Sequence, residues 1–296
     1  MIQQSFKYTL FYVYQITIFL YTFKINFKII QMNILIDGLH FPEGPAFDQQ
    51  GTIWLVEKEA GNLIRYRDNK YDRIQVDGHP NGIAIAPDGT VWFCDALQNS
   101  IRRYNPADSS CDTLLNKLDG KALKMPNDLC FDSNGNLLFT CPGSESTDGT
   151  GYICCLRTNG MAHVVHQNMY YPNGLAFAPN SSQLYIAETG SKWIWKMNWN
   201  ALSCQMDSIE KFALAGGQIG PDGLAFDEEG NLFVAIYGSG HILALDQSGI
   251  ATEKIQTAGQ NPTNCALDPY GTMGLIITEA EKGQLLQLNH TKKGIL

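Results

Sequence analysis

The sequence is short of charged residues and has no long polar run. Only 17% of its 296 residues are Asp, Glu, Lys or Arg, while 28 residues are glycine and 11% are aromatic. A disordered tail needs a long stretch of polar and charged residues, so this composition argues against one. The composition is typical instead of many short strands joined by tight turns.

Several catalytic and metal-binding motifs are also missing. The chain has no G-x-S-x-G segment and no H-E-x-x-H segment, so it lacks the parts of a serine hydrolase of that type and of a zincin. Its eight cysteines include no C-x-x-C pair. Those inside apolar, strand-like runs are Cys94, Cys130, Cys141 and Cys154. We interpret them as free buried thiols, which predicts a reducing compartment and a cytoplasmic protein.

Basic residues are scarce. Outside residues 1–31 the chain has 18 Lys and Arg residues against 29 Asp and Glu residues, a balance of −11. Proteins that bind nucleic acid carry positive charge to contact the phosphates. We therefore expect no nucleic-acid partner.

Residues 1–31 differ from the rest of the chain, since they contain no Gly, Pro, Ala, Asp or Glu. Their apolar part, residues 8–23, is interrupted by Gln15 and is shorter than the ~20 residues of a membrane-spanning helix. No small-residue cleavage site follows Lys7. We expect an extension outside the fold, with translation starting at Met32. A membrane anchor and an uncleaved signal stay open, and a membrane is a partner only if the segment is an anchor. Residues 32–296 are predicted to form one domain.

A tripeptide that begins with proline recurs along the chain, each time followed by a short apolar run, a turn rich in Asp, Asn and Gly, and a second apolar run. The copies are PEG at Pro42, PNG at Pro80, PND at Pro126, PNG at Pro172, PDG at Pro221 and PTN at Pro262, with spacings of 38, 46, 46, 49 and 41 residues. Short strands that repeat every ~40 to 50 residues are the signature of propeller blades, each a four-stranded antiparallel sheet. The sequence therefore predicts an all-β, six-bladed β-propeller.

The fourth and last repeats indicate how the blades are built. In the fourth repeat, the runs GLAFA, QLYIAE and WIWKMN have the alternation and residue types of strands. The last repeat supplies only three such runs, TNCALD, GLIITE and QLLQLN, whereas residues 33–37 (NILID) can supply a fourth. We predict that this N-terminal strand closes the last blade and the ring, which removes two open sheet edges.

The tripeptides carry the polar side chains of greatest interest. The first strand of a propeller blade lines the central channel, so residues just ahead of these strands crowd around one mouth. The polar residues concerned are Glu43, Asn81, Asn127, Asp128, Asn173, Asp222 and Asn264. Carboxylates and amide carbonyls are hard oxygen donors, which calcium prefers, whereas His and Cys ligands would suit zinc or copper. The pattern predicts a calcium site, although Asn81 and Asn264 are equally well explained as turn formers.

Five segments carry a family resemblance: FPEGPAFD (41–48), PNDLCFDSNGNLLFT (126–140), YPNGLAFAPN (171–180), GPDGLAFDEEGNLFVAIYGSG (220–240) and NPTNCALD (261–268). In this order and at blade spacing, residues 39–288 resemble the SMP-30/gluconolactonase/LRE family, which has relatives among calcium-dependent phosphotriesterases of squid type. By that resemblance Glu43, Asn173 and Asp222 match calcium ligands. Asn127 matches a residue that binds the metal or the substrate beside it.

The resemblance implies a calcium-dependent hydrolase that opens a small-molecule lactone. Ca²⁺ would polarise the lactone carbonyl and stabilise the oxyanion, and Zn²⁺, Mn²⁺ or Mg²⁺ can substitute for it. Asp222 would deprotonate the attacking water or attack the substrate itself. The expected substrate-binding residues are Asn127, Asp128, Asn81, Glu188 and Tyr237. Two other readings stay open: a phosphotriesterase or aryl esterase on the same metal site, and a non-catalytic binding propeller.

Topology predicts the rim of this mouth. Because neighbouring strands are antiparallel, the second strand of each blade ends where the first begins. The residues placed there are Glu57, Asp95, the loop 142–151, Glu188, Thr189, Tyr237 and Glu279. The loop 142–151, which is rich in Gly, is a candidate lid or a plain solvated connection. We read His79 as a turn residue and His241 as a strand residue.

One position departs from the family pattern. Sugar-lactone enzymes of the vertebrate branch carry Arg two residues before the residue that matches Asn127, and this chain has Met125 there. The resemblance still implies a lactonase, but recognition of a sugar acid through that cation is not expected.

Overall fold

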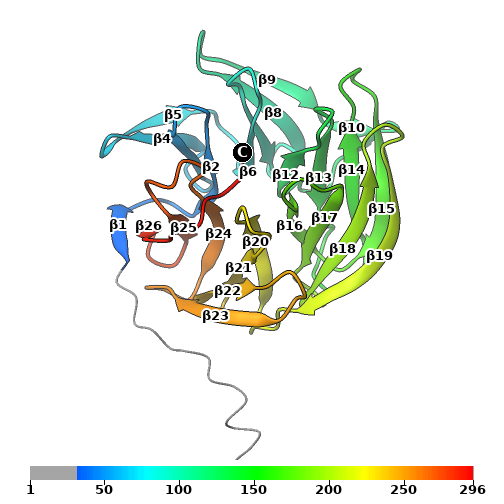
Figure 1. Ribbon diagram of the computed structural model, residues 1–296. Coiled ribbons are helices and arrows are strands. Elements are labelled where there is room, and N and C mark those ends of the chain that lie inside the picture. The colour runs from blue at the N-terminus through cyan, green and yellow to red at the C-terminus, as the bar shows by residue number, and fades with distance from the viewer. Residues whose placement is uncertain (1–31, 296) are drawn as a thin grey trace, which may run out of the picture.

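The structure, a computed structural model, describes residues 32–295, and each regular element in that range is a β-strand. Six sheets of four antiparallel strands surround a central axis, as Figure 1 shows in a view along that axis. The chain is therefore the predicted six-bladed β-propeller. None of the described residues forms a helix of the length and apolarity needed to cross a membrane. The predictions for residues 1–31 lie outside the described residues.

Blades 1 to 3 each run from an inner strand at the channel to an outer strand at the rim. Blade 1 consists of β2 (Pro42–Phe47), β3 (Ile53–Glu57), β4 (Asn62–Arg67) and β5 (Lys70–Gln75). Blade 2 consists of β6 (Pro80–Ile85), β7 (Val91–Asp95), β8 (Ser100–Asn105) and β9 (Ser110–Leu115). Blade 3 consists of β12 (Leu129–Phe131), β13 (Leu137–Cys141), β14 (Gly151–Leu156) and β15 (Ala162–Met169). The hairpin of β10 (Lys117–Leu118) and β11 (Lys121–Ala122) joins blades 2 and 3.

Blades 4 to 6 repeat this order. Blade 4 consists of β16 (Pro172–Phe177), β17 (Gln183–Glu188), β18 (Trp193–Asn200) and β19 (Gln205–Leu214). Blade 5 consists of β20 (Gly220–Phe226), β21 (Leu232–Tyr237), β22 (His241–Leu245) and β23 (Ala251–Gln256). Blade 6 consists of β24 (Pro262–Leu267), β25 (Leu275–Glu279), β26 (Gln284–Leu288) and β1 (Asn33–Ile36).

The N-terminal strand closes the ring, as predicted. β1 pairs antiparallel with β26, with Asn33 opposite Gln287 and Ile34 opposite Leu286. The inner strands contact one another in the order β2, β6, β12, β16, β20, β24 and back to β2. Every inner strand therefore has an inner strand on each side, which fixes the positions of the six tripeptides around the channel.

The hydrophobic core lies between the blades. Six clusters of buried apolar side chains each join two consecutive blades. Leu55 of β3 and Ile276 of β25, for example, belong to the cluster between blades 1 and 6, and both are fully buried. Truncating such a side chain to alanine typically costs about 2–5 kcal/mol of folding free energy. Tight packing between blades therefore makes the ring a rigid frame for the channel.

Blade 3 differs from the sequence pattern. Its inner strand begins at Leu129, three residues after Pro126, whereas the other inner strands begin at or beside the tripeptide proline. Asn127 and Asp128 nevertheless stay in line with the sheet. The N–H of Asn127 donates to Thr140 O, and the N–H of Thr140 donates to Asp128 O, both at 2.9 Å.

The eight cysteines are all free, as predicted. Cys94, Cys141 and Cys154 are buried, and Cys130 is partly buried. Burial raises the pKa of the Cys94 thiol and of the Cys130 thiol well above the ordinary value. Such thiols stay protonated and are poor nucleophiles.

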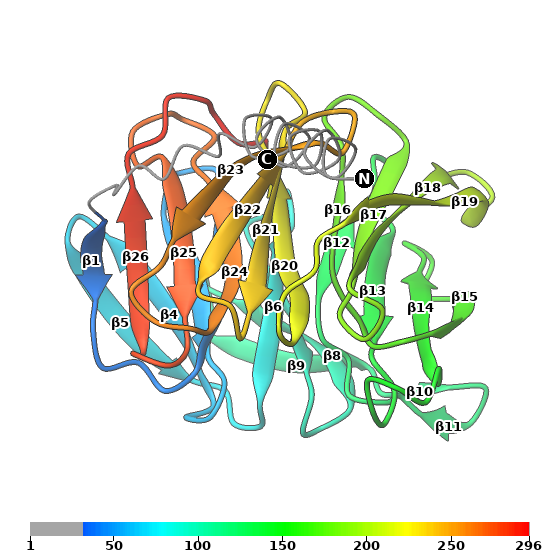
Figure 2. The same ribbon diagram turned by 90° about the horizontal axis from the view of Figure 1, so that it is seen from below.

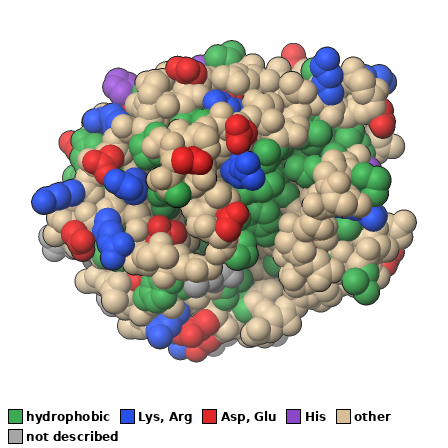
Figure 3. Space-filling model, turned by 90° about the horizontal axis from the view of Figure 1, so that it is seen from above, with side chains coloured by type: hydrophobic (Ala, Val, Ile, Leu, Met, Phe, Trp, Pro, Cys, Tyr) green, Lys and Arg blue, Asp and Glu red, His purple; other side chains and the backbone are tan. Residues whose placement is uncertain are grey.

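The two ends of the channel are different, and Figure 2 views the propeller from the side. We call the end where the inner strands begin the tripeptide end, and the opposite one the C-terminal end. At the C-terminal end, Gly294 forms a β-bridge with Asp227, and Lys293 O accepts the N–H of Glu228 at 2.7 Å. On the side seen in Figure 3, positive and negative side chains are interspersed, and apolar side chains gather in a hollow.

Candidate functional site

At the tripeptide end each inner strand starts opposite the end of the second strand. Pro42 pairs with Glu57, and the pairing register of this blade shifts between Glu43 and Ala46. Four other blades have a register shift at the same place. Bulges of this kind re-aim side chains and are frequent beside active sites. They allow the tripeptide side chains to leave the regular alternation of the strand.

Two tripeptide glycines make room for polar side chains of the next blade. A Cβ atom on Gly82 would lie 2.1 Å from Asp128 Oδ1. A Cβ atom on Gly223 would lie 1.9 Å from Asn264 Cγ. Only glycine permits such an approach, so these glycines seat the two polar side chains beside the inner strands.

Asp128 and Asn264 meet across the channel. Blades 3 and 6, from which they come, are opposite in the ring, and Asn264 Nδ2 donates to Asp128 Oδ2 at 3.2 Å. Asp128 Oδ1 accepts the N–H of Leu129 and Asn264 Oδ1 accepts the N–H of Cys265, both at 2.8 Å. Residues far apart in sequence therefore converge at one point, as the tripeptide pattern predicts.

Three buried carboxyl groups share this end of the channel. Glu43, Asp128 and Asp222 come from alternate blades and are 4%, 8% and 7% exposed. Burial raises the pKa of Glu43 to about 7 and that of Asp128 to about 7. Burial, followed by the negative charge of Glu43, raises the pKa of Asp222 well above its ordinary value. When the three groups are ionised, the site carries an excess of negative charge and they repel one another.

Amide side chains accompany the carboxyls. Asn173 Nδ2 donates to Thr189 Oγ1 at 3.3 Å, and the Asn173 side chain lowers the pKa of the Asp222 carboxyl. Asn81 Oδ1 is buried and has no hydrogen-bond partner among the described residues. Asn127 is buried as well. A buried acceptor without a donor is costly, so the orphan oxygen of Asn81 marks a place for a bound cation or water.

The donor chemistry at this end fits a hard divalent cation. The predicted ligands supply two carboxyls, Glu43 and Asp222, and two amides, Asn127 and Asn173. Glu43 and Asn173 both affect the pKa of Asp222, whereas the Asn127 side chain makes no hydrogen bond to these residues within residues 32–295. In that range no three His, Cys, Asp or Glu side chains are grouped as metal ligands. A metal site here would therefore depend on amide oxygens, which calcium accepts readily.

The sequence reasoning did not identify Lys58 and Tyr171, which also belong to this end. The charge of Lys58 lowers the pKa of Glu43 and of Asp222, although not enough to offset their burial. Burial raises the pKa of Tyr171, and the charges of Asp222 and Glu43 raise it further. Both residues are next to predicted positions. Lys58 directly follows the end of β3, and Tyr171 directly precedes β16, so the topological rule that selected their neighbours could have found them.

Tyr237 shares this environment. It is the last residue of β21, opposite Gly220, and it is partly buried. Burial raises its pKa, and the charges of Asp222 and Glu43 contribute to the rise. Tyr237 therefore lies within electrostatic reach of the carboxyl groups, a position that suits the predicted role in substrate binding.

The predicted rim carboxyls instead hold the backbone. Glu188 is 2% exposed, and its oxygens accept the Tyr170 N–H at 2.7 Å, the Trp195 Nε1–H at 2.8 Å and the Ser191 hydroxyl. Each of these bonds fixes a loop or strand around the mouth. A direct contact between Glu188 and substrate stays a prediction.

The corresponding acids of other blades do the same. Asp95 accepts the His79 N–H at 3.0 Å and forms an ion pair with Arg102 at 3.0 Å. Glu57 is paired with Arg73 at 2.8 Å, and Glu279 accepts the Asn261 N–H at 2.8 Å. These carboxyls position the loops that lead into the inner strands.

The connection between β13 and β14 lies beside the mouth. A Cβ atom on Gly149 would be 3.5 Å from the ring of Tyr170, which precedes β16. A Cβ atom on Gly190 would lie 2.0 Å from Ser146 O. The loop thus packs against the entrance of blade 4. His79 lies in the turn before β6 and His241 opens β22, as predicted.

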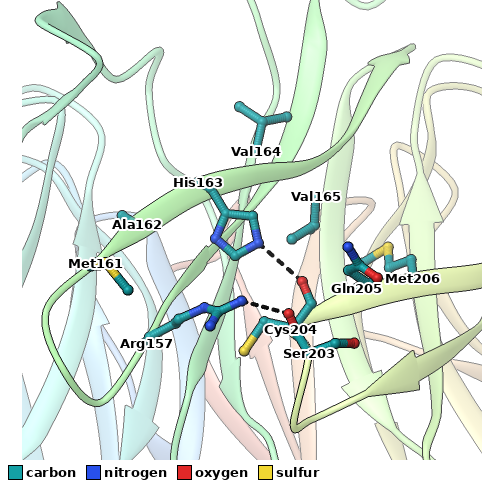
Figure 4. Close-up of a pocket in the computed structure, with 10 residues that line it drawn as sticks. All are labelled: Arg157, Met161, Ala162, His163, Val164, Val165, Ser203, Cys204, Gln205 and Met206. Carbon is teal, nitrogen blue, oxygen red and sulfur yellow. Dashed lines mark hydrogen bonds between the residues drawn. The ribbon is translucent and has the colours of Figure 1, made fainter.

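A pocket of about 630 Å³ lies away from this end, between the outer strand β15 and the turn that joins β18 to β19 (Figure 4). Arg157 Nη2 donates to Ser203 O at 2.5 Å, and the His163 Nε2 is 3.0 Å from Cys204 O. These contacts hold the turn of blade 4 against blade 3. The lining contains none of the tripeptide residues, so we assign the candidate site to the channel.

The chain has relatives among enzymes of known type. It is 24% identical over 280 residues to a gluconolactonase from Zymomonas mobilis, and this alignment covers 81% of this chain and 76% of the relative. It is also 28% identical over 284 residues to a diisopropyl-fluorophosphatase from Loligo vulgaris, and this second alignment covers 85% of this chain and 90% of the relative.

A solved structure and a family model indicate the same group of proteins as these relatives. The structure of a gluconolactonase from Xanthomonas campestris superposes with a TM-score of 0.78 at 25% identity, which covers 88% of this chain and 89% of the other. The model of the SMP-30/gluconolactonase/LRE-like region matches residues 41–281. This match spans all six tripeptides, and the chain therefore belongs to the SMP-30/gluconolactonase/LRE-like family.

Proposed function

We propose that this protein is a calcium-dependent hydrolase that opens a small lactone. The observation that carries the proposal is the convergence of three buried carboxyl groups, Glu43, Asp128 and Asp222, in a site where their charge is only partly offset. A purely structural channel would be more stable with apolar groups there, since buried unpaired charges are costly. The relatives named gluconolactonase and diisopropyl-fluorophosphatase support a hydrolase.

The ligands of the proposed ion are Glu43, Asn173 and Asp222, with Asn127 as a fourth. Bound calcium would supply polarisation of the lactone carbonyl and stabilisation of the oxyanion. Asp222, whose pKa is lowered by the neighbouring Asn173 side chain although burial keeps it raised, takes the proton of the attacking water at a carboxylate oxygen. The water oxygen bonds to the carbonyl carbon, the ring C–O bond breaks, and the alkoxide takes up the proton, leaving a hydroxy acid.

Other residues in this proposal bind and orient the substrate. Tyr237 and Tyr171 border the carboxyl groups and limit access of bulk water. Asp128 is held by Asn264 and accepts a hydroxyl or water proton at the opposite side of the channel. Asn81 offers its unpaired oxygen to the substrate or to an ordered water.

The proposal is tested by hydrolysis of δ- and γ-lactones with and without a calcium chelator, and with Asp222→Asn. We expect chelation to abolish activity, calcium to restore it, and Asp222→Asn to lower kcat on the order of 10²–10⁴-fold. Asp207→Asn, which changes an exposed acid on the outer strand β19, is the matched control and should keep full rate. Unchanged hydrolysis after thorough chelation would exclude the metal mechanism.

Two roles for Asp222 are separated by isotope labelling. In a single turnover in H₂¹⁸O, a general base leads to label in the product, because the attacking oxygen comes from water. If Asp222 attacks the carbonyl itself, the first product carries an unlabelled oxygen from the carboxylate and the label appears in the protein. Mass spectrometry of product and of the peptide that contains Asp222 distinguishes the two.

Hydrolysis of a phosphotriester or aryl ester on the same site is the second candidate. It is favoured by the similarity to the diisopropyl-fluorophosphatase, which extends over 90% of that relative. Assaying phosphotriesters and aryl acetates beside the lactones decides between them. A kcat/KM at least about tenfold higher for one class identifies the principal activity.

A further inference from the structure

Three bulky residues that directly precede tripeptide prolines have left-handed backbones. The φ angles are 56° at Phe41, 50° at Met125 and 60° at Tyr171. Left-handed conformations are uncommon outside glycine and rare for bulky residues, and a following proline disfavours helical conformations further. Blade 5 has a glycine at the equivalent place, Gly220 before Pro221. The chain therefore keeps large side chains where glycine would be less strained.

Two of these residues, Phe41 and Tyr171, lie near the carboxyl groups. The ring of Phe41 is 4.9 Å from Lys58 Nζ, whose charge acts on both Glu43 and Asp222. Tyr171 is partly buried and is within reach of the charges of the same two carboxyls. Strained residues cluster at ligand clamps, where the strain is retained because the side-chain position serves binding. We call Phe41, Met125 and Tyr171 the apolar collar.

Exposed apolar side chains continue the collar outward at the same end. Met125 is 40% exposed, and its N–H donates to Asn99 Oδ1 at 2.8 Å, which ties its loop to blade 2. Leu97, Tyr170 and Ile219 are 60%, 47% and 47% exposed. Leu97 follows β7, while Tyr170 and Ile219 lie just before β16 and β20. Apolar surface that continues into a polar site is typical of a ligand-binding mouth.

The chemistry of this surface disfavours a sugar. Hydroxyl groups pressed against the collar would lose hydrogen bonds to water without replacement, whereas an alkyl or aryl group would gain from the same burial. Lys192, a nearby cation, already donates to Gly217 O at 2.8 Å and to Gln218 O at 3.2 Å. Lys58 faces the carboxyl groups. The mouth therefore offers a polar floor and an apolar wall.

We infer that the apolar collar binds an alkyl or aryl substituent of the lactone, so that the protein prefers substituted apolar lactones to sugar-acid lactones. The inference rests on the proposed function for the identity of the reacting ring. The collar selects between substrates, while the carboxyls and amides carry out the reaction.

The test compares kcat/KM of the calcium-loaded protein for δ-decalactone, which carries a pentyl group, and for glucono-δ-lactone. We expect a ratio of at least about ten in favour of the pentyl lactone, and Phe41→Ala and Tyr171→Ala should each lower that ratio about tenfold. Ile250→Ala, at an apolar residue that is 63% exposed outside this end, should leave the ratio unchanged. A preference for the sugar lactone, or a ratio insensitive to both collar variants, overturns the inference.

Calorimetric binding of the corresponding δ-lactams separates this inference from the proposed function. If no lactone is hydrolysed, the proposed function fails, yet tighter binding of the pentyl lactam than of the sugar lactam, lost in Phe41→Ala, still supports the collar. Equal binding of both lactams to the wild type contradicts it. Hydrolysis of both lactones at equal rates contradicts the collar while the proposed function stands.

Glycine substitution distinguishes a binding role from a structural one. Met125→Gly removes the side chain and also the left-handed strain, so the Tm should stay equal or rise while the substrate ratio falls about threefold or more. Ile250→Gly, whose φ is not left-handed, should lower the Tm and keep the ratio. A lower Tm for Met125→Gly with an unchanged ratio would show that the side chain serves only packing.

Discussion

Asp268, at the C-terminal end of the channel, and Asp222, at the tripeptide end, are both buried acids of inner-strand segments, but their surroundings are opposite. The Asp268 carboxylate accepts the N–H of Tyr270 at 2.8 Å and those of Thr272 and Met273 at 2.6 Å. Although burial alone would raise its pKa, these N–H groups hold it below the ordinary value. Asp222 lies near other acids and has a raised pKa.

The difference separates an acid that stabilises a turn from acids whose negative charge is only partly offset. Asp268 closes a turn, and Asp132 and Asp227 do the same after their own inner strands. At the tripeptide end the ionised forms of Glu43, Asp128 and Asp222 destabilise the chain, and in our proposal a bound cation offsets this cost. Bulges in the inner strands and the left-handed backbones of Phe41, Met125 and Tyr171 also lie at this end.

The largest expected effect is on activity. Glu43→Gln should lower kcat/KM on the order of 100-fold, because it removes a proposed metal ligand. The Tm of the chelated protein should stay equal or rise, since a buried acid is replaced by a neutral group. Steady-state kinetics and thermal unfolding measure both. A Glu43→Gln variant that is fully active but unstable would remove the contrast between the two ends.

The reverse pattern is expected at the C-terminal end. Asp268→Ala leaves buried backbone N–H groups without an acceptor and should lower the free energy of unfolding by about 2–3 kcal/mol. Its kcat/KM below the unfolding transition should match the wild type. Urea denaturation and lactone hydrolysis measure the two quantities. Loss of activity without loss of stability would assign Asp268 to function instead.

The two ends should also respond to pH in opposite directions. Glu43 and Asp128 have pKa values of about 7 in the folded protein, above the ordinary 4.5 and 3.8. The folded chain therefore binds more protons than the unfolded chain, and stability is lost as pH rises from about 4 to about 7. Asp268, with its lowered pKa, stabilises the fold above about pH 4 and loses this contribution as pH falls.

Urea denaturation of chelated protein at pH 5 and pH 7.5 measures the contribution of the tripeptide end. We expect a lower free energy of unfolding at pH 7.5, by about 2 kcal/mol for Glu43 alone. Saturating calcium should abolish the difference, because the ion stabilises the ionised carboxyls. Equal stability at both pH values without calcium would contradict the assignment of excess negative charge.

The smallest expected effect concerns Lys58. Its ammonium group offsets part of the charge of Glu43 and Asp222, so it competes with a bound cation. Lys58→Met should bind calcium about tenfold more tightly, which corresponds to ~1.4 kcal/mol. Lys211→Met, on the outer strand β19, is the control. Weaker calcium binding by Lys58→Met would mean that the lysine supports the site.

The fold could be predicted because each blade repeats the same local signal. Pro42, Pro80, Pro172, Pro221 and Pro262 lie at the start of inner strands, and the incomplete last repeat correctly placed residues 33–37 in the same blade. The late start of β12 and the hairpin β10–β11 have no such signal. Both features depend on the geometry of the long connection between blades 2 and 3.

The site could be predicted only in part. The repeat brought Glu43, Asp128, Asp222 and Asn264 to one end because strand order fixes where a residue lies. It does not fix where a side chain points. Glu188 and Tyr237 end equivalent strands, yet Glu188 turns into the loop backbone, and Tyr237 faces the charges of the channel. The left-handed backbones of the collar occur directly before tripeptide prolines, but the residue types Phe, Met and Tyr give no signal of that conformation.

Pairing of β1 with β26 has a consequence for how the propeller unfolds. An open array of repeats can fray from its terminal repeats, since each repeat is held only by its neighbours. Here the first and last described strands lie in one sheet, so the ring has no terminal repeat from which to fray. Opening any blade breaks the packing on both of its sides, and global loss of structure should therefore be a single cooperative event.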